Sequence, residues 1–113
     1  MISSDVIRGY SDMIILYLLL EEDSYGYEIS KRIREFSNEK YTMKETTLYS
    51  AFNRLSKNGY IEAYYGDETQ GKRRTYYRIT VKGRQYYQEK CEEWSLTKDV
   101  VNCFVEEGKD GNN

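Results

Sequence analysis

The sequence predicts a mainly α-helical (α+β) fold, in which three helices are followed by a two-stranded hairpin and one long helix. Apolar residues recur at helical spacing in three segments between residues 4 and 57. Two aromatic and β-branched runs follow, at 60–65 and 73–79, and helical spacing returns from residue 81. This order of elements is typical of a winged helix-turn-helix with an additional C-terminal helix.

The first helix is expected over residues 4–20, with Ser4 as its N-cap and Asp5 favourable in its first turn. Its second half, 13–20, is apolar nearly all round, which indicates burial on more than one side. In a chain of 113 residues, we expect a partner subunit to cover part of this surface. The apolar run falls far short of the roughly 20 residues needed to span a bilayer.

The second and third helices form the predicted helix-turn-helix. The second covers 25–37 after Ser24 as N-cap, and its apolar stripe consists of Tyr25, Ile29, Ile33 and Phe36. The third covers 45–57 and has two faces, because its apolar residues Leu48, Ala51, Phe52 and Leu55 lie opposite the polar residues Thr46, Ser50, Asn53 and Lys57. Asn58 and Gly59 end this helix, since glycine suits the C-cap conformation.

The hairpin loop, 66–72, leads directly into a run of cations, Lys72, Arg73 and Arg74. Thr80 is the expected N-cap of a last helix that runs from 81 to about 106. A heptad-like stripe on this helix predicts a dimer interface made of Tyr87, Trp94, Thr97, Val101 and Phe104. The chain therefore divides into a winged-helix domain (1–80, whose helix 4–20 also contributes to the dimer), a dimerisation helix (81–107) and a disordered tail (108–113).

Charge is strongly segregated along the chain. Residues 31–84 contain thirteen lysines and arginines against six acids, whereas the remainder contains four against thirteen, for a net charge of −2. A basic central segment is typical of a surface that binds phosphates. The polar face of the third helix would enter the major groove of DNA while the cationic hairpin contacts the backbone. Tyr49, at the edge of that face, either contacts DNA or packs against the second helix, and Tyr25 and Tyr27 are expected to pack.

Other functional classes find little support in the sequence. Histidine is absent, and so are a nucleophile elbow, a Gly-rich phosphate loop and Cys-x-x-Cys, so we expect no enzyme, metal site or cofactor. Cys91 and Cys103 on one helix would lie about 18 Å apart, too far for a disulfide. Without a signal-peptide pattern, the cytoplasm is the expected compartment. The alternative function is a winged-helix module that binds RNA or another protein rather than duplex DNA.

Four motifs, in order, resemble the PadR family of bacterial transcriptional regulators. They are YGYEI at 25–29, TLY at 47–49, LSKNGYI at 55–61 and GKRRTYYRIT at 71–80. The similarity covers about residues 8–104, and the short last helix matches the small subfamily. The resemblance implies a homodimer that binds a palindromic operator in double-stranded DNA, mostly as a repressor. The implied DNA contacts are Lys44, Thr46, Thr47, Tyr49, Ser50, Asn53, Arg54, Lys57, Lys72, Arg73 and Arg74.

The segment GDETQG at 66–71 and Trp94 further resemble the small multidrug-sensing repressors of this family. In those proteins the matching tryptophans of both subunits line a flat pore and stack on planar drugs. The resemblance implies a ligand site at the dimer centre that consists of Trp94, Asp12, Met13, Cys91 and Lys98. Because Lys90 and Lys98 lie one helical turn on either side of Trp94, we expect a neutral or anionic planar ligand rather than a cationic one.

Overall fold

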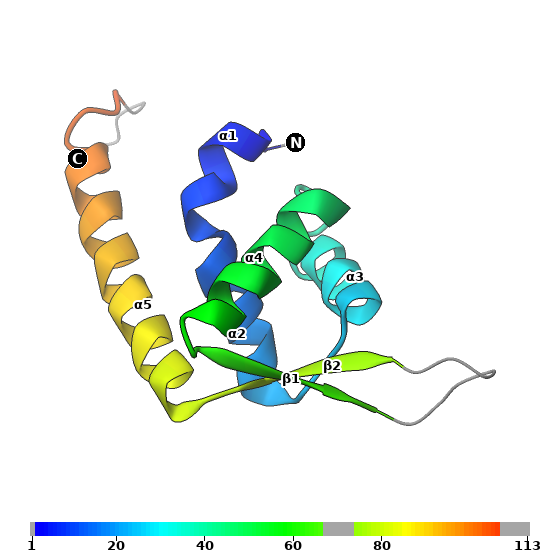
Figure 1. The fold of residues 1–113 in the computed structure, drawn as a ribbon. Coiled ribbons are helices and arrows are strands. Elements are labelled where there is room, and N and C mark those ends of the chain that lie inside the picture. Colours follow the sequence, from blue (N-terminus) through cyan, green and yellow to red (C-terminus); the bar gives the residue numbers. More distant parts are fainter. Residues whose placement is uncertain (1, 67–73, 107–113) are drawn as a thin grey trace.

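The computed structural model describes residues 2–66 and 74–106 and contains the predicted elements in the predicted order (Figure 1). The elements are α1 (Ser4–Ile7), the 3₁₀ helix η1 (Arg8–Tyr10), α2 (Ser11–Glu21), α3 (Gly26–Phe36), α4 (Glu45–Lys57), β1 (Ile61–Tyr65), β2 (Thr75–Ile79) and α5 (Val81–Asn102). The mainly helical α+β fold and its winged helix-turn-helix are thereby confirmed. The predicted loop cations Lys72 and Arg73 and the predicted tail 108–113 lie outside the described residues.

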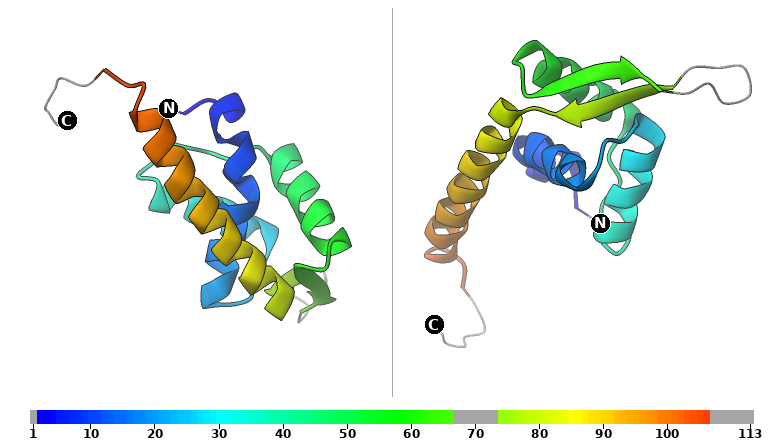
Figure 2. Two further views of the ribbon diagram at one scale, coloured as in Figure 1. Left: turned by 90° about the vertical axis from the view of Figure 1, so that its left-hand side faces the viewer. Right: turned by 90° about the horizontal axis from the view of Figure 1, so that it is seen from below.

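The helix α2 lies at the centre of the fold, with α5 on one side and α3 and α4 on the other (Figures 1 and 2). Its residues Ile15, Leu16 and Leu19 are at most 1% exposed. The prediction that this apolar segment is buried on more than one side is confirmed, but the chain's own helices provide that cover. The side that carries Met13, Ile14 and Tyr17 faces an open groove.

The first helix is not continuous over 4–20, as the sequence predicted, but is interrupted at η1. Gly9 lies in the middle of the interruption, and glycine is the residue that costs an α-helix most after proline. The N-cap is also one residue earlier than predicted, because the Ser3 hydroxyl accepts a hydrogen bond from the Val6 amide at 3.3 Å. The chain therefore changes direction at Tyr10, just before α2 enters the core.

Ser24 is not the N-cap of the second helix. Its amide donates to the Tyr77 carbonyl at 3.2 Å, and the Tyr77 amide donates to the Ser24 carbonyl at 2.8 Å. Pairing with β2 wins over capping here because Ser24 is only 3% exposed and its backbone groups need partners. Tyr25 takes the N-cap position without a side-chain cap, and α3 spans 26–36 rather than 25–37.

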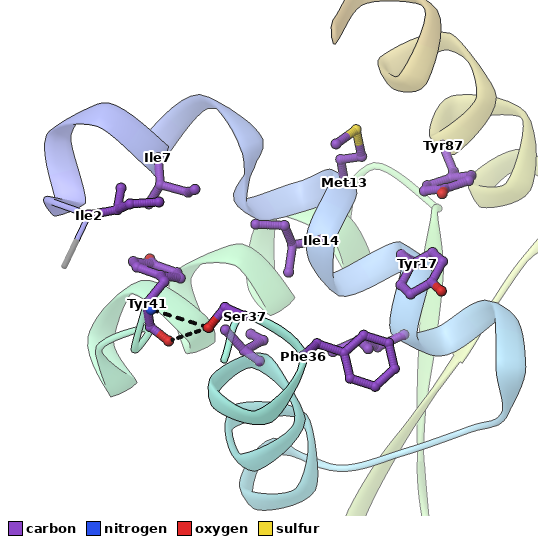
Figure 3. A pocket seen from close by; sticks show the side chains of 11 residues that line it. Ile2, Ile7, Met13, Ile14, Tyr17, Phe36, Ser37, Tyr41 and Tyr87 are labelled. Atoms are coloured by element: carbon purple, nitrogen blue, oxygen red, sulfur yellow. Dashed lines mark hydrogen bonds between the residues drawn. The ribbon is translucent and has the colours of Figure 1, made fainter. Parts of the chain in front are cut away.

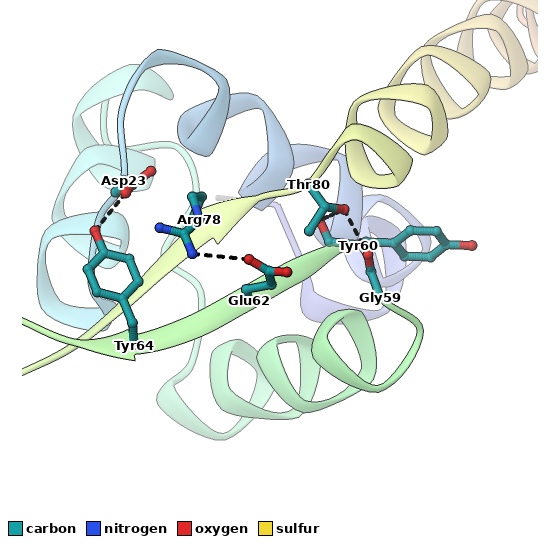
Figure 4. A network of polar contacts seen from close by, with 7 residues as sticks. All are labelled: Asp23, Gly59, Tyr60, Glu62, Tyr64, Arg78 and Thr80. Atoms are coloured by element: carbon teal, nitrogen blue, oxygen red, sulfur yellow. Dashed lines mark hydrogen bonds and ion pairs between the residues drawn. The ribbon is translucent and has the colours of Figure 1, made fainter.

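The two strands pair antiparallel, from Ile61 opposite Ile79 to Tyr65 opposite Thr75. β1 begins one residue later than predicted, and β2 begins at Thr75 rather than at residue 73. Two side-chain contacts brace the hairpin from outside (Figure 4). Arg78 donates to Glu62 across the strands at 3.1 Å, and the Tyr64 hydroxyl donates to Asp23 at 2.6 Å, which ties β1 to the segment before α3.

A tight corner joins the hairpin to α5. As predicted, Thr80 is the N-cap: its hydroxyl accepts from the Gly83 amide at 3.0 Å and donates to the Gly59 carbonyl at 2.7 Å (Figure 4). Gly83 packs directly on the Tyr60 carbonyl, where no Cβ would fit. Gly59, with φ of 81°, ends α4 as predicted. α5 ends at Asn102, about four residues before the predicted end, and Cys103 and Phe104 form a turn.

Candidate nucleic-acid interface

The recognition-helix candidate α4 has the two faces that its sequence predicts. Its apolar residues Leu48, Ala51, Phe52 and Leu55 are at most 2% exposed, because they pack into the core. Four polar side chains on the opposite face are exposed to solvent: Thr46, Ser50, Asn53 and Lys57. Lys44, at the N-cap position, is also exposed, whereas Thr47 is half-buried. One side of α4 therefore presents hydroxyl, amide and ammonium groups to the solvent.

Arg74, at the base of the hairpin loop, lines one cleft together with Tyr49 of α4 and Tyr25. Its guanidinium carbon is 4.1 Å from the centre of the Tyr25 ring, and the Tyr25 ring meets Tyr76 edge-on at 5.3 Å. A cation over an aromatic face is attracted by the ring quadrupole. The cation therefore has a fixed position between α3 and β2, while Lys72 and Arg73 lie outside the described residues.

Tyr49 both packs on α3 and stays accessible. Its ring meets Phe52 edge-on at 5.4 Å, and its hydroxyl lies over Gly26, where any Cβ would collide with it. The side chain is still 44% exposed. The packing that the sequence left open is therefore present, and it holds the hydroxyl against the start of α3.

Arg54, expected at the DNA, forms an ion pair with Asp12, expected at the ligand. The Arg54 Nη2 and Nε atoms lie 2.5 Å from Oδ1 and 3.3 Å from Oδ2 of Asp12. Hydrogen bonding to Asp12 raises the pKa of Arg54 above its ordinary value. The pair joins α4 to the first turn of α2, so a residue predicted at the DNA and one predicted at the ligand are in direct contact.

Of the predicted ligand residues, the structure brings Trp94 and Met13 together. Trp94 is 40% exposed and meets the Tyr10 ring edge-on at 5.1 Å. A groove of about 360 Å³ is lined by these residues together with Ile2, Val6, Ile7 and Ile14. Among the described residues, Asp12, Cys91 and Lys98 do not line it. Both cysteines are free, and a hydrogen bond to Cys91, with burial, raises the pKa of Tyr87 to about 12.

A second apolar groove adjoins the first through Met13 and Ile14 (Figure 3). It has a volume of about 350 Å³ and lies between α1, α2, α3 and the start of α5, where Tyr17, Phe36 and Tyr87 form one end. Ile2, Ile7 and Tyr41 were not predicted here, and Phe36, predicted on the apolar stripe of the second helix, lines the groove with its side chain 55% exposed. The excess of apolar residues in 13–20 was the available signal.

The predicted interface stripe of α5 is partly uncovered. Tyr87 packs on Tyr17 with ring centres 6.3 Å apart, but Val101 and Phe104 are 51% and 84% exposed. Leu96 and Val100 add further exposed apolar surface, at 66% and 51%. Several large apolar side chains therefore stay exposed near the end of α5, as is common where another chain covers a surface.

Comparison with known proteins agrees with this architecture. A family model described as "Transcriptional regulator PadR-like family" matches residues 15–89. The chain belongs to the PadR-like family of transcriptional regulators. Members of this family bind DNA and typically dimerise, and the family is one of regulators rather than enzymes. In the part of the chain that the structure describes, no helix is long and apolar enough to cross a membrane.

This PadR-like chain is similar to several proteins over nearly its whole length. A transcriptional regulator from Clostridium thermocellum is 70% identical, with a TM-score of 0.86, and the match covers 93% of this chain and 99% of that one. A PadR family transcription regulator from Clostridium difficile is 38% identical, with a TM-score of 0.72 and coverage of 85% and 98%. "Uncharacterized protein X" of Lysinibacillus sphaericus is 50% identical over 94% of this chain and 97% of its own length.

Proposed function

We propose that this PadR-like regulator is a cytoplasmic repressor that binds a palindromic operator as a homodimer and is released by a planar aromatic ligand. The observation that carries the DNA-binding part is the exposed polar face of α4, together with Arg74, which lines one cleft with Tyr49 of the same helix. A helix with Ser, Asn and Lys on one face suits the major groove, where base edges present donors and acceptors. The Arg74 guanidinium, held over the Tyr25 ring, suits the phosphate backbone, which carries no sequence information.

DNA binding is tested with duplexes that contain palindromes. Two-fold symmetry predicts half-site centres about 34–36 Å apart, one helical turn of DNA. Replacing Ser50 or Asn53 should change which sequence is preferred, by about 1–3 kcal/mol for each good base contact. Replacing Lys72, Arg73 and Arg74 together should weaken binding to every sequence and flatten the salt dependence, by about 0.9 in log–log slope per lost phosphate contact.

An unchanged salt slope in that triple variant would contradict the role of the hairpin. The alternative function, an RNA-binding or protein-interaction module, predicts a different result in the same experiment. Duplex RNA or a single strand would then compete for the protein as well as the palindromic duplex does. A duplex that competes at least tenfold better than either supports an operator.

The proposed dimer is supported by the uncovered apolar surface at both ends of the chain. The open grooves beside η1 and α2 are complementary in character to the exposed Val101 of α5 and Phe104 just after it, since both surfaces are apolar. Sedimentation of the wild-type chain should give twice 13.5 kDa at micromolar concentration. Val101→Lys with Phe104→Lys should give monomers or insoluble chain, and a monomeric wild type would overturn the dimer.

The proposed ligand site is supported by the exposed ring of Trp94 and its apolar groove. Stacking of an indole on a flat ring contributes about 0.5–1.5 kcal/mol beyond burial. Lys90 is engaged by Glu93 at 2.6 Å, whereas Lys98 is exposed outside the groove, where its charge favours a neutral or anionic ligand over a cationic one. Such a ligand weakens DNA binding only if it prefers a dimer conformation that DNA does not.

The chain has a single tryptophan, so indole fluorescence reports on this site alone. A panel of planar compounds, such as phenolic acids and flavin-like rings, should include one that quenches it saturably. That quenching should weaken when operator DNA is present. Unchanged fluorescence with the whole panel, together with normal regulation by Trp94→Ala, would leave Trp94 as interface packing only.

A further inference from the structure

A separate polar cleft lies between the helix-turn-helix and the hairpin. Its volume is about 310 Å³, and its lining consists of Tyr25, Gly26, Tyr27, Tyr49, Arg74, Thr75 and Tyr77. The sequence predicted that Tyr25 and Tyr27 pack. Tyr25 does so, under Arg74, but Tyr27 is 70% exposed. A phenol at this position has little packing to explain it, whereas its hydroxyl is available to a ligand.

Three elements hold the cleft in shape. The paired backbones of Ser24 and Tyr77 fix the start of α3 against β2, with hydrogen bonds of 2.8 and 3.2 Å. Gly26 allows the Tyr49 hydroxyl of α4 to approach the α3 backbone closely. On the hairpin side, the Tyr25 ring holds the Arg74 guanidinium at 4.1 Å. Side chains with donors from α3, from α4 and from Arg74 just before β2 therefore line one cleft before any ligand arrives, which reduces the ordering cost of binding.

We infer that this cleft binds one phosphate group of the DNA backbone in each half-site. Arg74 supplies the positive charge, and the hydroxyls of Tyr27 and Tyr49 donate two neutral hydrogen bonds to the phosphate oxygens. Tyrosine hydroxyls and arginine are both common donors to DNA phosphates. No aspartate or glutamate is among the described residues that line the cleft. The inference rests on the proposed function, because it names a further contact of the same DNA surface.

A neighbouring hollow helps to define where the phosphate lies. It has a volume of about 180 Å³, shares Gly26, Tyr27 and Tyr49 with the cleft, and is also lined by Glu45. The carboxylate of Glu45 repels a phosphate, and Arg74 does not line this hollow. The phosphate is therefore expected on the hairpin side of Tyr27 and Tyr49. This contact would fix the position of α4 along the groove without reading a base.

The mixture of charged and neutral donors gives the inference a distinctive signature in salt titrations. Only a cationic side chain releases counterions from DNA, at about 0.9 in log–log slope per contact. Arg74→Gln should therefore weaken binding and flatten the slope. Tyr27→Phe and Tyr49→Phe should weaken binding about tenfold each, as for a lost hydrogen bond to a charged group, and leave the slope unchanged. The loss should be equal for operator and unrelated duplexes.

The decisive experiment combines these variants with operators that carry a single neutral methylphosphonate at each backbone position in turn. For the wild-type protein, the methylphosphonate at one position per half-site should lower the DNA affinity by an amount that includes the contacts of the cleft. At that position, and not at others, the losses from the methylphosphonate and from Tyr27→Phe or Arg74→Gln should be less than additive. Tyr64→Phe is the matched control, because its hydroxyl is engaged by Asp23 and it does not line the cleft.

Tyr27→Phe is the variant on which the inference stands, since an exposed side chain that loses one oxygen leaves folding intact. If Tyr27→Phe and Tyr49→Phe bind like the wild type, or if their effects add to every methylphosphonate, the cleft holds no phosphate while the operator function stands. If the wild type binds no duplex at all, the proposed function itself fails. A loss for Tyr27→Phe that is confined to one operator sequence would indicate a base contact and would also overturn the inference.

Discussion

Replacing Asp12 with asparagine keeps the shape of the side chain but removes the charge from the ion pair that joins α2 to α4. The two ends of this pair differ in their surroundings, because the Asp12 side chain is 14% exposed and the Arg54 side chain is 49% exposed. Fully exposed ion pairs contribute roughly 0.2–1 kcal/mol to stability. Removing one partner of a fully buried pair costs about 3–5 kcal/mol.

The Asp12–Arg54 pair lies between these limits, because water screens the arginine but not the carboxylate. We expect Asp12→Asn to lower the free energy of unfolding by about 1–2 kcal/mol, after allowance for that screening. For a domain of this size, each 1 kcal/mol corresponds to a fall of about 4–8 °C in the melting temperature. The cost arises because the two hydrogen bonds to the carboxylate lose their charge and one of them loses its acceptor.

Urea unfolding at one fixed protein concentration measures this difference, since a dimer's stability depends on concentration. Glu62→Gln is the matched control, because it removes the acid of the Arg78–Glu62 pair, whose side chains are 51% and 60% exposed. Its effect should stay below about 1 kcal/mol. If both variants unfold at the same urea concentration as the wild type, the pair does not hold α4 against α2 and the reasoning is wrong.

Three further perturbations follow from the packing. Gly83→Ala should lower the free energy of unfolding by about 1–3 kcal/mol, because its Cβ would meet the Tyr60 carbonyl and lie 2.9 Å from Ile79 Cγ1. Thermal melts measure this loss, and Gly9→Ala, whose Cβ meets nothing within 4 Å, should be neutral or stabilising in them. Phe52→Ala should cost about 3–5 kcal/mol in urea, because the buried ring that stacks on Tyr77 at 4.0 Å is lost, and a cost below 1 kcal/mol would contradict that packing. The hydrogen bond to Asp23 raises the pKa of Tyr64 above its ordinary value of 10.0, so its contribution to stability is full below about pH 10 and is lost as the pH rises through the raised pKa. The stability difference between the wild type and Tyr64→Phe should therefore shrink in alkaline urea titrations, and a difference that grows with pH would show the wrong sign.

The sequence was most informative where local and tertiary signals agreed. α4 spans 45–57 as predicted, because its apolar stripe and the stop at Gly59 describe the same helix. Ser24 shows the opposite case, since a serine before a helical stripe is a normal N-cap signal, but pairing with Tyr77 overrides it. The interruption at η1 was missed because its only local mark is Gly9 within an otherwise helical pattern.

The candidate site was predictable to the extent that it lies on one element. The polar face of α4 follows from helical periodicity alone. The pairing of Asp12 with Arg54 joins residues 42 positions apart, and no periodicity indicates it. The exposed position of Tyr27 depends likewise on how the hairpin approaches α3. Such relations between elements arise from tertiary packing, for which a single sequence carries little signal.

The contacts at residues 80–83 hold the hairpin and α5 at one angle to each other. The Thr80 hydroxyl donates to the Gly59 carbonyl before β1 and accepts from the Gly83 amide of α5. Gly83 packs directly on the Tyr60 carbonyl, and the Tyr60 and Tyr86 rings stack 4.1 Å apart at an angle of 6°. A rotation of α5 therefore turns the hairpin with it, and each hairpin residue is displaced in proportion to its distance from this corner. In the proposed dimer, the two α5 helices would pack on each other, and the two hairpins would contact the DNA backbone. A change of angle too small to break any contact between the subunits would then suffice to alter the distance between the two hairpins, and with it the fit to the two half-sites.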